Sequence, residues 1–330
     1  MIKFINMKAV GLISGGLDSI LALQLIKEQG FEIIGIFIKT PFLSNFGNNT
    51  VKNLEKLSEE MKFKLIILKS DMDYIEIVRN PQFGYGKNLN PCIDCHIYML
   101  KKAKEIMEKE NALFVFTGEV LGQRGKSQNP QALKIIEEKT SLKGKLLRPL
   151  TALNLPPTEM EKTGIINRSH LLDIKGKSRK LQLYLADMKN LKYFGTPSGG
   201  CLLTDPIFCK KLKDLFENSE EINLNDCYVL QIGKHFRVSS KTKLIISRDE
   251  KESKNLLNFC NKNDFIILLE KNSDLTGLIK GEIDDLVFEI LSGYLKTESD
   301  VVFVKNYSGK IMEKRIIKKQ NKINYSKFLI

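Results

Sequence analysis

The segment that most limits what this chain can fold into is Ser14–Ser19, with the sequence SGGLDS. It follows the short apolar run KAVGLI, residues 8–13, and precedes an amphipathic stretch from Ile20 to Gln29. That order predicts a strand, a glycine-rich turn and a helix. Glycines at such a turn let backbone N–H groups approach phosphate oxygens, and the start of the helix adds partial positive charge there. The segment therefore predicts a phosphate-binding loop.

The pattern S-G-G-x-D-S directly after the first strand resembles the signature of the PP-loop ATP pyrophosphatases. The loop has neither the G-K-[ST] ending of a Walker loop nor the spacing G-x-G-x-x-G. Enzymes of the PP-loop superfamily cleave ATP between its α and β phosphates and adenylate a carbonyl oxygen. The resemblance implies that the ATP phosphates are held by Ser14, Gly15, Gly16, Asp18 and Ser19. An acidic residue inside the loop also suits Mg²⁺ on the phosphates. The alternative is a purely structural glycine-rich turn.

Strand and helix signals alternate as far as residue 150. We expect strands at 8–13, 31–40, 64–70, 112–119 and 146–150, helices at 20–29, 51–61 and 91–109, and a loop at 71–91. Strands spaced by helices imply right-handed crossovers and a doubly wound parallel sheet, a Rossmann-like α/β fold.

The pattern of predicted helices and strands changes in the second half of the sequence. Residues 151–213 are helical and basic, and from about 218 short strands are mixed with helices at 250–262 and 284–295. We therefore expect two domains, 1–214 and 215–330, the second a smaller α+β module that includes a strand in CYVLQIG. The last stretch, Lys305–Ile330, is read either as a solvated edge strand and tail or as an RNA-contacting arm.

The composition fits a folded protein with an anionic partner. The chain has 330 residues, of which 42% are hydrophobic and 28% charged, which excludes disordered, collagen-like and coiled-coil classes. No apolar run approaches the roughly 18 residues of a membrane span, and the N-terminus does not resemble a signal peptide, so we expect a cytoplasmic protein without a membrane partner. The 52 Lys and Arg exceed the 39 Asp and Glu, for a net charge of +13, which favours nucleic acid binding.

A second motif, TGEVLGQRGKSQ at Thr117–Gln128, follows the fourth expected strand. The carboxyl ends of parallel strands face the crevice in which such sheets bind ligands. The motif resembles that of 4-thiouridine synthetases, which sulfurate tRNA, and LLRPL with Arg148 resembles their next strand. The resemblance implies that the walls of the activation site include Gly118, Glu119, Gln123, Ser127 and Gln128. Arg124 or Lys126 could steady developing phosphate charge, or both could be solvated loop charges.

Three of the six cysteines form a third constellation. Cys92 and Cys95 lie at a helix start in NPCIDCHIYML, where the helix dipole favours thiolate, and Cys201 lies in the tight turn PSGGC. Three thiolates suit a [4Fe–4S] cluster whose fourth iron can bind sulfide. The NPC-x-x-C stretch is similar to that of 2-thiouridylases, and three-cysteine clusters occur in PP-loop tRNA thiolases.

Other uses of these thiols remain open. Cys201 could form a persulfide, with a second cysteine closing a disulfide behind it. Alternatively, the C-x-x-C could hold structural zinc that His96 or Cys201 completes. The remaining cysteines stand alone in apolar or helical settings and are expected to fill the core: Cys209, Cys227 and Cys260.

Together these resemblances imply an ATP-dependent tRNA sulfurtransferase. Its catalytic residues would be Asp18, Cys92, Cys95 and Cys201, its cofactors ATP, Mg²⁺ and the cluster, and its partners tRNA and a sulfur donor, either sulfide or a cysteine desulfurase. Thiolation at C2 or at C4, and function as a monomer or a homodimer, stay open. The alternatives are a PP-loop amidating enzyme and an RNA-binding protein switched by ATP.

The segment 232–256 resembles the RNA-binding domain of NFACT-type ribosome quality-control proteins. Only seven residues precede the first expected strand, so we expect this module to hold RNA. The resemblance implies phosphate contacts by its basic residues Lys234, Arg237, Lys241, Lys243 and Arg248. His235 is expected to be a packed or backbone-bonded residue and not a catalyst.

Overall fold

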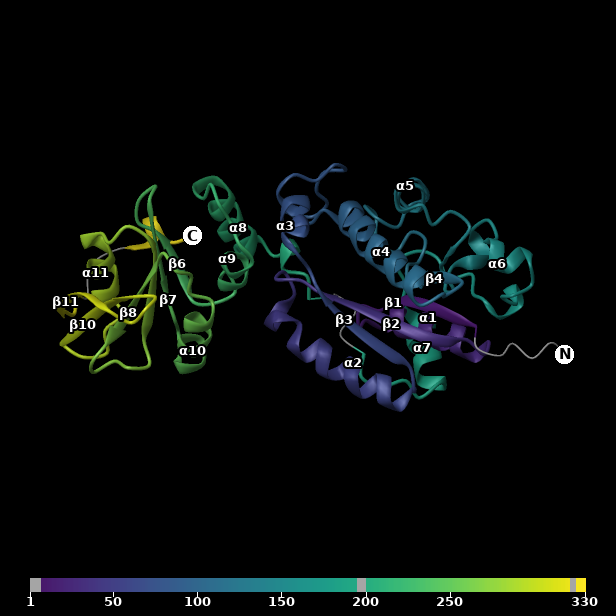
Figure 1. The fold of residues 1–330 in the computed structure, drawn as a ribbon, viewed down its shortest axis with the longest axis horizontal. Coiled ribbons are helices and arrows are strands. Elements are labelled where there is room, and N and C mark those ends of the chain that lie inside the picture. The colour runs from purple at the N-terminus through teal and green to yellow at the C-terminus, as the bar shows by residue number, and fades with distance from the viewer. Residues whose placement is uncertain (1–6, 195–199, 321–324) are drawn as a thin grey trace. The chain divides into compact units, whose positions relative to one another are not determined.

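The computed structural model describes residues 7–194, 200–320 and 325–330. The chain forms two compact units, one ending at Cys201 and the other beginning at Leu202 (Figure 1). The boundary expected after residue 214 therefore falls inside helix α8 (Pro206–Asn218). This helix belongs to the second unit because its Asp214 binds Arg237 and Lys243, which lie on the sheet of that unit.

The first unit is built on a parallel sheet with the strand order β3-β2-β1-β4-β5. Its strands are β1 (Lys8–Leu12), β2 (Glu32–Lys39), β3 (Lys64–Lys69), β4 (Phe114–Thr117) and β5 (Leu146–Leu147). All four pairings are parallel. Strand β2 is buried along almost its whole length, as a strand covered on both faces must be. The doubly wound α/β fold expected from the sequence is confirmed.

Helices cover both faces of this sheet. They are α1 (Leu17–Glu28), α2 (Asn48–Glu60), α3 (Met72–Arg79), α4 (Cys92–Lys109), α5 (Pro130–Thr140), α6 (Glu159–Lys162) and α7 (Lys180–Met188). Figure 1 shows α2 and α7 on one side of the sheet and α4 and α5 on the other. Because β1 and β4 are neighbours whose following helices lie on opposite faces, the ligand crevice of such a sheet opens where these two strands end.

Helix α3 lies in the segment for which the sequence predicted a loop. Its N-cap is Asp71, whose side chain accepts a hydrogen bond from the backbone N–H of Tyr74. Ile75 and Val78 are buried one turn apart. A helix of eight residues is too short to give a clear apolar period, so tertiary burial decides it.

The second unit is a six-stranded antiparallel sheet with the order β11-β10-β8-β9-β7-β6. Besides α8 it contains α9 (Leu224–Val229), β6 (Lys234–Arg237), β7 (Thr242–Ile246), α10 (Glu250–Asn258), β8 (Asp264–Leu269), β9 (Thr276–Gly281), α11 (Asp285–Ser292), β10 (Ser299–Asn306) and β11 (Ile311–Lys318). Strand β9 was not expected. Strand β11 lies at one edge of the sheet, as one of the two readings of the C-terminal stretch predicted.

The strand expected in CYVLQIG is wrong, because these residues belong to helix α9 and the turn after it. The helix starts at a capping box in which the Asn223 side chain accepts from the N–H of Asp226 and the Asp226 side chain accepts from the N–H of Asn223. This reciprocal capping satisfies donors that a strand would have paired elsewhere. Within the described parts of the chain, no helix is long and apolar enough to span a bilayer.

Candidate functional site

The loop between β1 and α1 has the geometry of a phosphate cradle. Gly15 adopts φ +76°, a left-handed conformation that glycine takes without a steric penalty, and Gly16 is the N-cap of α1. The first backbone N–H groups of α1 thus open at the end of the parallel sheet, where the helix dipole also favours an anion. The turn lies where the sequence predicted it.

The hydroxyl groups of the loop hold its shape. Ser19 Oγ donates to the carbonyl oxygen of Gly16 at 2.8 Å and accepts from the backbone N–H of Ser14 at 3.2 Å. Ser14 Oγ in turn accepts from the N–H of Gly16 at 3.3 Å. Ser19 is buried, so in this structure its hydroxyl pins the loop from inside.

The end of β4 touches the loop directly. A Cβ atom on Gly118 would lie 2.5 Å from the backbone nitrogen of Ser19, so only glycine permits this approach. Beyond it, Gln123 Nε2 donates to Asp18 Oδ2 at 2.6 Å, and Gln182 Nε2 on α7 donates to Gln123 Oε1 at 3.0 Å. A chain of three polar groups, of which Gln123 and Gln182 are buried, therefore links α1, the segment after β4, and α7.

Several acceptor oxygens on this chain and on the segment 117–128 are buried without a donor. Within the described residues, Asp18 Oδ1, Gln128 Oε1 and Gln182 Oε1 have no hydrogen-bond partner. An unpaired buried acceptor costs free energy, so such atoms are rare unless a ligand, an ion or water completes them. A carboxylate oxygen without a donor beside a phosphate cradle fits Mg²⁺ bound together with a nucleotide.

Glu119 forms the centre of a buried ion-pair network beside the crevice. Its Oε2 accepts from Arg148 Nε and from Thr117 Oγ1, both at 3.0 Å, and its Oε1 lies 2.8 Å from His96 Nδ1. Burial alone would raise the pKa of Glu119, but the charge of Arg148 and the hydrogen bond with His96 hold it at about 2. Glu119 is therefore ionised and fastens α4 and β5 to the end of β4.

The candidate thiols lie at the same edge of the sheet. Cys92 is the first residue of α4, one position after Pro91, and Cys95 follows one turn later. Tyr74 Oη lies 3.1 Å from Cys95 Sγ. Cys201 pairs with Leu43 in an isolated bridge after β2, and its sulfur accepts a hydrogen bond from the Asn90 side chain at 3.7 Å.

The thiols differ in how well they tolerate ionisation. Burial raises the pKa of Cys95 to about 12, with further contributions from Cys201 and Cys92, against a hydrogen bond from Tyr74 that lowers it. Burial also raises the pKa of Cys92, but the positive charge of Arg124 acts in the opposite direction. Lys126 and the Ser127 hydroxyl likewise favour the Cys92 thiolate.

The segment 117–128 thus joins the two halves of the site. Gln123 contacts the carboxylate of Asp18, while the next residues, Arg124 to Ser127, act on the thiol of Cys92. Arg124 and Lys126 are exposed, yet their charges bear on a thiol and not only on solvent. The sequence-predicted loop residues and the C-x-x-C are therefore neighbours.

The thiols do not form a preformed metal site. Across the described residues, which include all six cysteines, no three His, Cys, Asp or Glu side chains lie close enough together to hold a metal ion. The Nδ1 of His96 is bonded to Glu119, so zinc completed by His96 would have to bind through its Nε2. Core positions are confirmed for Cys209, Cys227 and Cys260.

Sequence reasoning missed Gln182 and Tyr74. Gln182 is fully buried, and it shares the inner side of α7 with Ala186, four residues later. A polar residue at the buried spacing of an amphipathic helix is the signal that could have identified it. Tyr74 could not be identified, because the helix that carries it was itself not expected.

Two of the basic residues expected to contact RNA are bound inside the second unit. Arg237 Nη2 and Lys243 Nζ each lie 2.8 Å from Asp214 Oδ2, and Lys243 is buried. Their expected role as phosphate contacts is therefore corrected to that of holding α8 on the sheet. The fully buried His235 bonds through Nε2 to the carbonyl oxygen of Ile232 at 2.8 Å, which confirms the packed role expected for it.

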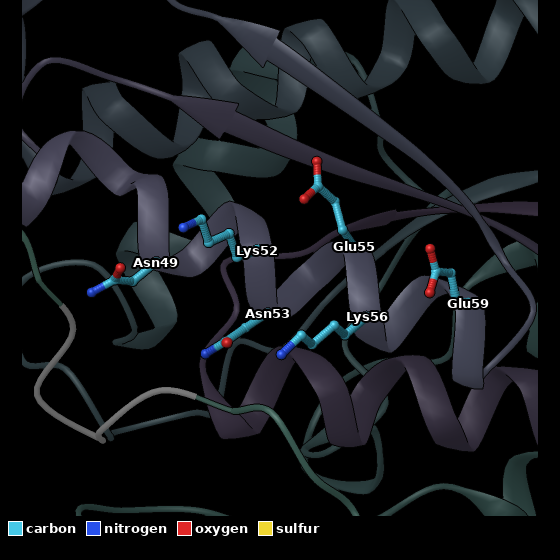
Figure 2. A pocket seen from close by; sticks show the side chains of 6 residues that line it. All are labelled: Asn49, Lys52, Asn53, Glu55, Lys56 and Glu59. Carbon is cyan, nitrogen blue, oxygen red and sulfur yellow. The ribbon is translucent and has the colours of Figure 1, made fainter.

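A surface hollow of about 510 Å³ lies on α2, apart from these groups. Figure 2 shows that its six side chains all come from this one helix: Asn49, Lys52, Asn53, Glu55, Lys56 and Glu59. Acidic, basic and amide groups alternate along it, as on any solvated helix face. The hollow is therefore not assigned to the site.

Several known proteins have sequences similar to that of this chain. A probable tRNA sulfurtransferase of Methanothermobacter thermautotrophicus is 24% identical over 250 residues, covering 72% of this chain and 54% of the relative. A tRNA-specific 2-thiouridylase of Campylobacter curvus is 29% identical over 108 residues, 32% of each chain. The chain thus spans between a third and about half of the length of these relatives.

Among solved structures, the U34-tRNA thiolase NcsA from Methanococcus maripaludis with its [4Fe-4S] cluster is 20% identical. The match covers 68% of this chain and 70% of that one, with a TM-score of 0.37. The family model of the NFACT protein RNA binding domain matches residues 233–321. The model of the thiamine biosynthesis protein (ThiI) family matches residues 4–173, more than half of the chain, so the chain belongs to the ThiI family.

Proposed function

We propose that this protein is an ATP-dependent tRNA sulfurtransferase that adenylates a uridine carbonyl oxygen and replaces that oxygen with sulfur. The observation that carries the proposal is the double contact of the segment 117–128. One of its residues, Gln123, binds Asp18 in the phosphate loop, and its neighbour Arg124 favours the thiolate of Cys92. A nucleotide site and a thiol site that share one segment suit activation followed by sulfur transfer.

The first step needs groups that bind the phosphates of ATP and balance their negative charge. The loop Ser14–Ser19 and the start of α1 would bind the phosphates of ATP, and Mg²⁺ held with help from Asp18 Oδ1 would supply positive charge to the leaving pyrophosphate. The uridine oxygen attacks the α-phosphorus, the bond to pyrophosphate breaks, and an O-adenylated base results. Gly118, Glu119, Gln123, Ser127 and Gln128 would wall this site.

The second step needs a sulfur nucleophile. Hydrosulfide or a persulfide attacks the activated carbon, the C–O bond breaks, and AMP leaves with the oxygen. If the sulfur comes from a Cys201 persulfide, a second thiol must attack Cys201 and form a disulfide, which an external reductant then reopens. Either Cys92 or Cys95 could serve, since both bear electrostatically on the same thiol cluster.

A three-cysteine [4Fe–4S] cluster is the other form of sulfur delivery that we propose to test. Three thiolates leave one iron open for sulfide, and Arg124 and Lys126 would balance the negative charge of such a cluster. The cluster route requires bound iron, whereas the persulfide route does not. The amount of iron on protein purified without oxygen therefore separates the two routes.

The partners follow from the same reaction. tRNA is the proposed substrate, and sulfide or a cysteine desulfurase is the proposed sulfur donor. The match of residues 233–321 to an RNA-binding domain supports RNA contact by the second unit. In that unit, Lys234 and Lys241 are exposed basic side chains that remain candidates for phosphate contact.

The experiment combines a product assay with a metal count. Protein purified without oxygen is incubated with tRNA, Mg²⁺-ATP and either sulfide or a cysteine desulfurase with cysteine, and nucleosides are analysed by mass spectrometry for thiouridine. Cys201→Ala should abolish thiolation while ATP binding persists, and Cys260→Ala, a core position, should retain activity. Thiolation that survives in Cys201→Ala would refute sulfur transfer at this thiol, and ATP-dependent amidation with ammonia instead of thiolation would refute the function.

A further inference from the structure

A basic segment outside the residues assigned so far lies directly beside the activation loop. Lys175 forms a parallel bridge with Leu121, and the backbone N–H of Gly176 donates to the carbonyl oxygen of Leu121 at 2.7 Å. These contacts hold the start of the segment 175–193 against the wall of the crevice. Whatever binds this segment therefore lies beside the site of adenylation.

The segment combines positive charge with exposed apolar and aromatic surface. Between 175 and 193 it has six basic residues and one acidic residue, Asp187. On the nine-residue helix α7, Tyr184 is 59% exposed and Met188 is 64% exposed, with Leu181 and Leu183 also on the surface. Apolar side chains of this size rarely face water together unless they meet a partner.

The two sides of α7 have separate roles. Gln182 and Ala186 face inward and are buried, and the helix packs against α1. Leu181, Tyr184 and Met188 recur at the i, i+3 and i+7 spacing, so they lie along one outer stripe. The exposed Lys177 and Lys180 lie at the head of this stripe. The inner side reaches the phosphate loop through Gln123, and the outer side is left for a ligand.

We propose that the outer α7 surface, formed by Lys175, Lys177, Lys180, Leu181, Tyr184 and Met188, binds a single-stranded stretch of the substrate RNA next to the modified base. The inference rests on the proposed function. Lysines would contact the phosphates, and bases would stack on Tyr184 and its apolar neighbours, which is how proteins hold single strands without reading sequence. The excess of basic groups favours an RNA strand over an apolar protein partner.

This placement agrees with what the reaction requires. A uridine must be splayed out of its stack before its carbonyl can reach the phosphate loop, so the flanking nucleotides need their own binding surface. The α7 surface begins at the bridge to Leu121, at the wall of the crevice. RNA held there is anchored on the same helix whose inner face binds Gln123.

Photocrosslinking in the full-length protein tests the contact. A benzoylphenylalanine is placed at Tyr184 and, as a matched control, at Lys134, an exposed position on α5 across the sheet. After irradiation with tRNA, we expect an RNA adduct at position 184 and none at 134. An adduct with a second copy of the protein, equal adducts at both positions, or no adduct at 184 would overturn the proposal.

Charge reversal gives a second, quantitative test. The double variant Lys177→Glu/Lys180→Glu should weaken tRNA binding roughly tenfold and reduce the slope of log K against log salt by about 1.4, because each phosphate contact to a single strand contributes about 0.7. The matched pair Lys134→Glu/Lys139→Glu on α5 should change neither. Crosslinking at position 184 without thiolation would support RNA binding by this surface and refute the proposed function. Thiolation without crosslinking would support the proposed function and refute RNA binding by this surface.

Discussion

Gln123 Nε2 donates a 2.6 Å hydrogen bond to Asp18 Oδ2 across 105 residues of sequence. The contact joins the loop after β1 to the segment after β4. Because a carboxylate oxygen accepts, the amide of Gln123 presents its NH₂ group to Asp18, and its Oε1 is left to accept from the Nε2 of Gln182. Gln123 and Gln182 therefore orient the carboxylate of Asp18.

Replacing Gln182 should weaken adenylation without unfolding the protein. Gln182→Leu frees the Gln123 amide to rotate, and the loss of one oriented hydrogen bond costs about 1 to 1.5 kcal/mol, roughly tenfold in rate. ATP–pyrophosphate exchange measured against ATP concentration reports it. Gln131→Leu, on the exposed face of α5, should have no effect. If Gln182 acts through Gln123, the double variant with Gln123→Leu should be no slower than Gln123→Leu alone.

Asp18→Ala should abolish adenylation. The change removes the carboxylate whose Oδ1 is buried without a donor, and with it the proposed anchor of Mg²⁺. Removal of one such electrostatic group typically lowers rates by about 10² to 10³. Pyrophosphate release in the presence of tRNA measures the effect, with Asp73→Ala, an exposed acid on α3, as the control. Exchange at the wild-type rate would show that the carboxylate is not used.

The Glu119 network should give the protein a defined acid sensitivity. The pKa of Glu119 in the folded protein is about 2, against a usual value of 4.5. The ionised form therefore stabilises the fold above about pH 4.5, by about 3 kcal/mol, and this contribution fades as the pH falls towards 2. Denaturant unfolding between pH 7 and pH 3 measures it.

Two variants separate this network from general acid denaturation. Glu119→Gln leaves the buried Arg148 without its main counter-ion, so it should lower the free energy of unfolding at pH 7 by about 3 kcal/mol and flatten the pH dependence. Glu137→Gln removes a more exposed partner of Arg148, at 3.5 Å, and should cost less than about 1 kcal/mol. Equal losses in both variants would contradict the role of Glu119.

The thiols should react at different rates with an alkylating agent. Burial and a pKa of about 12 keep Cys95 protonated and shielded, whereas Arg124 and Lys126 favour the Cys92 thiolate. In metal-free protein, iodoacetamide should label Cys92 before Cys95, as mass spectrometry of timed digests would show. Arg124→Ala should slow the labelling of Cys92 severalfold, because it removes the positive charge that most favours the Cys92 thiolate. Labelling of Cys95 first would contradict this order.

In the second unit, Asp214 should contribute far more to the free energy of unfolding than a surface carboxylate does. It is the shared partner of Arg237 and the buried Lys243, so Asp214→Asn leaves two cations without their counter-ion and should lower the free energy of unfolding by about 3 kcal/mol. Asp274→Asn removes an exposed pairing with Lys296 and should cost less than about 1 kcal/mol. Thermal unfolding of both variants provides the comparison.

Local patterns in the sequence determined the phosphate loop, the parallel sheet and the nucleotide end of the site. SGGLDS is readable because a strand, a turn and a helix are adjacent in the chain, and each depends on short-range chemistry. The order of strands and helices then implies where β1 and β4 end, so the meeting of Ser14–Ser19 with 117–128 follows from general rules for parallel sheets.

Only the tertiary structure decided which groups are paired. From the sequence, Arg237 and Lys243 are expected to be surface charges, but in the folded chain α8 places Asp214 beside both of them. Helices α3 and α9 depend on N-terminal caps and on burial, which the periodicity of the sequence does not show. The relay from Gln182 to Asp18 joins residues far apart in sequence, and no local pattern encodes the distance between them. Side-chain partners follow from packing, which is a property of the whole fold, whereas loops and strands follow from their own residues.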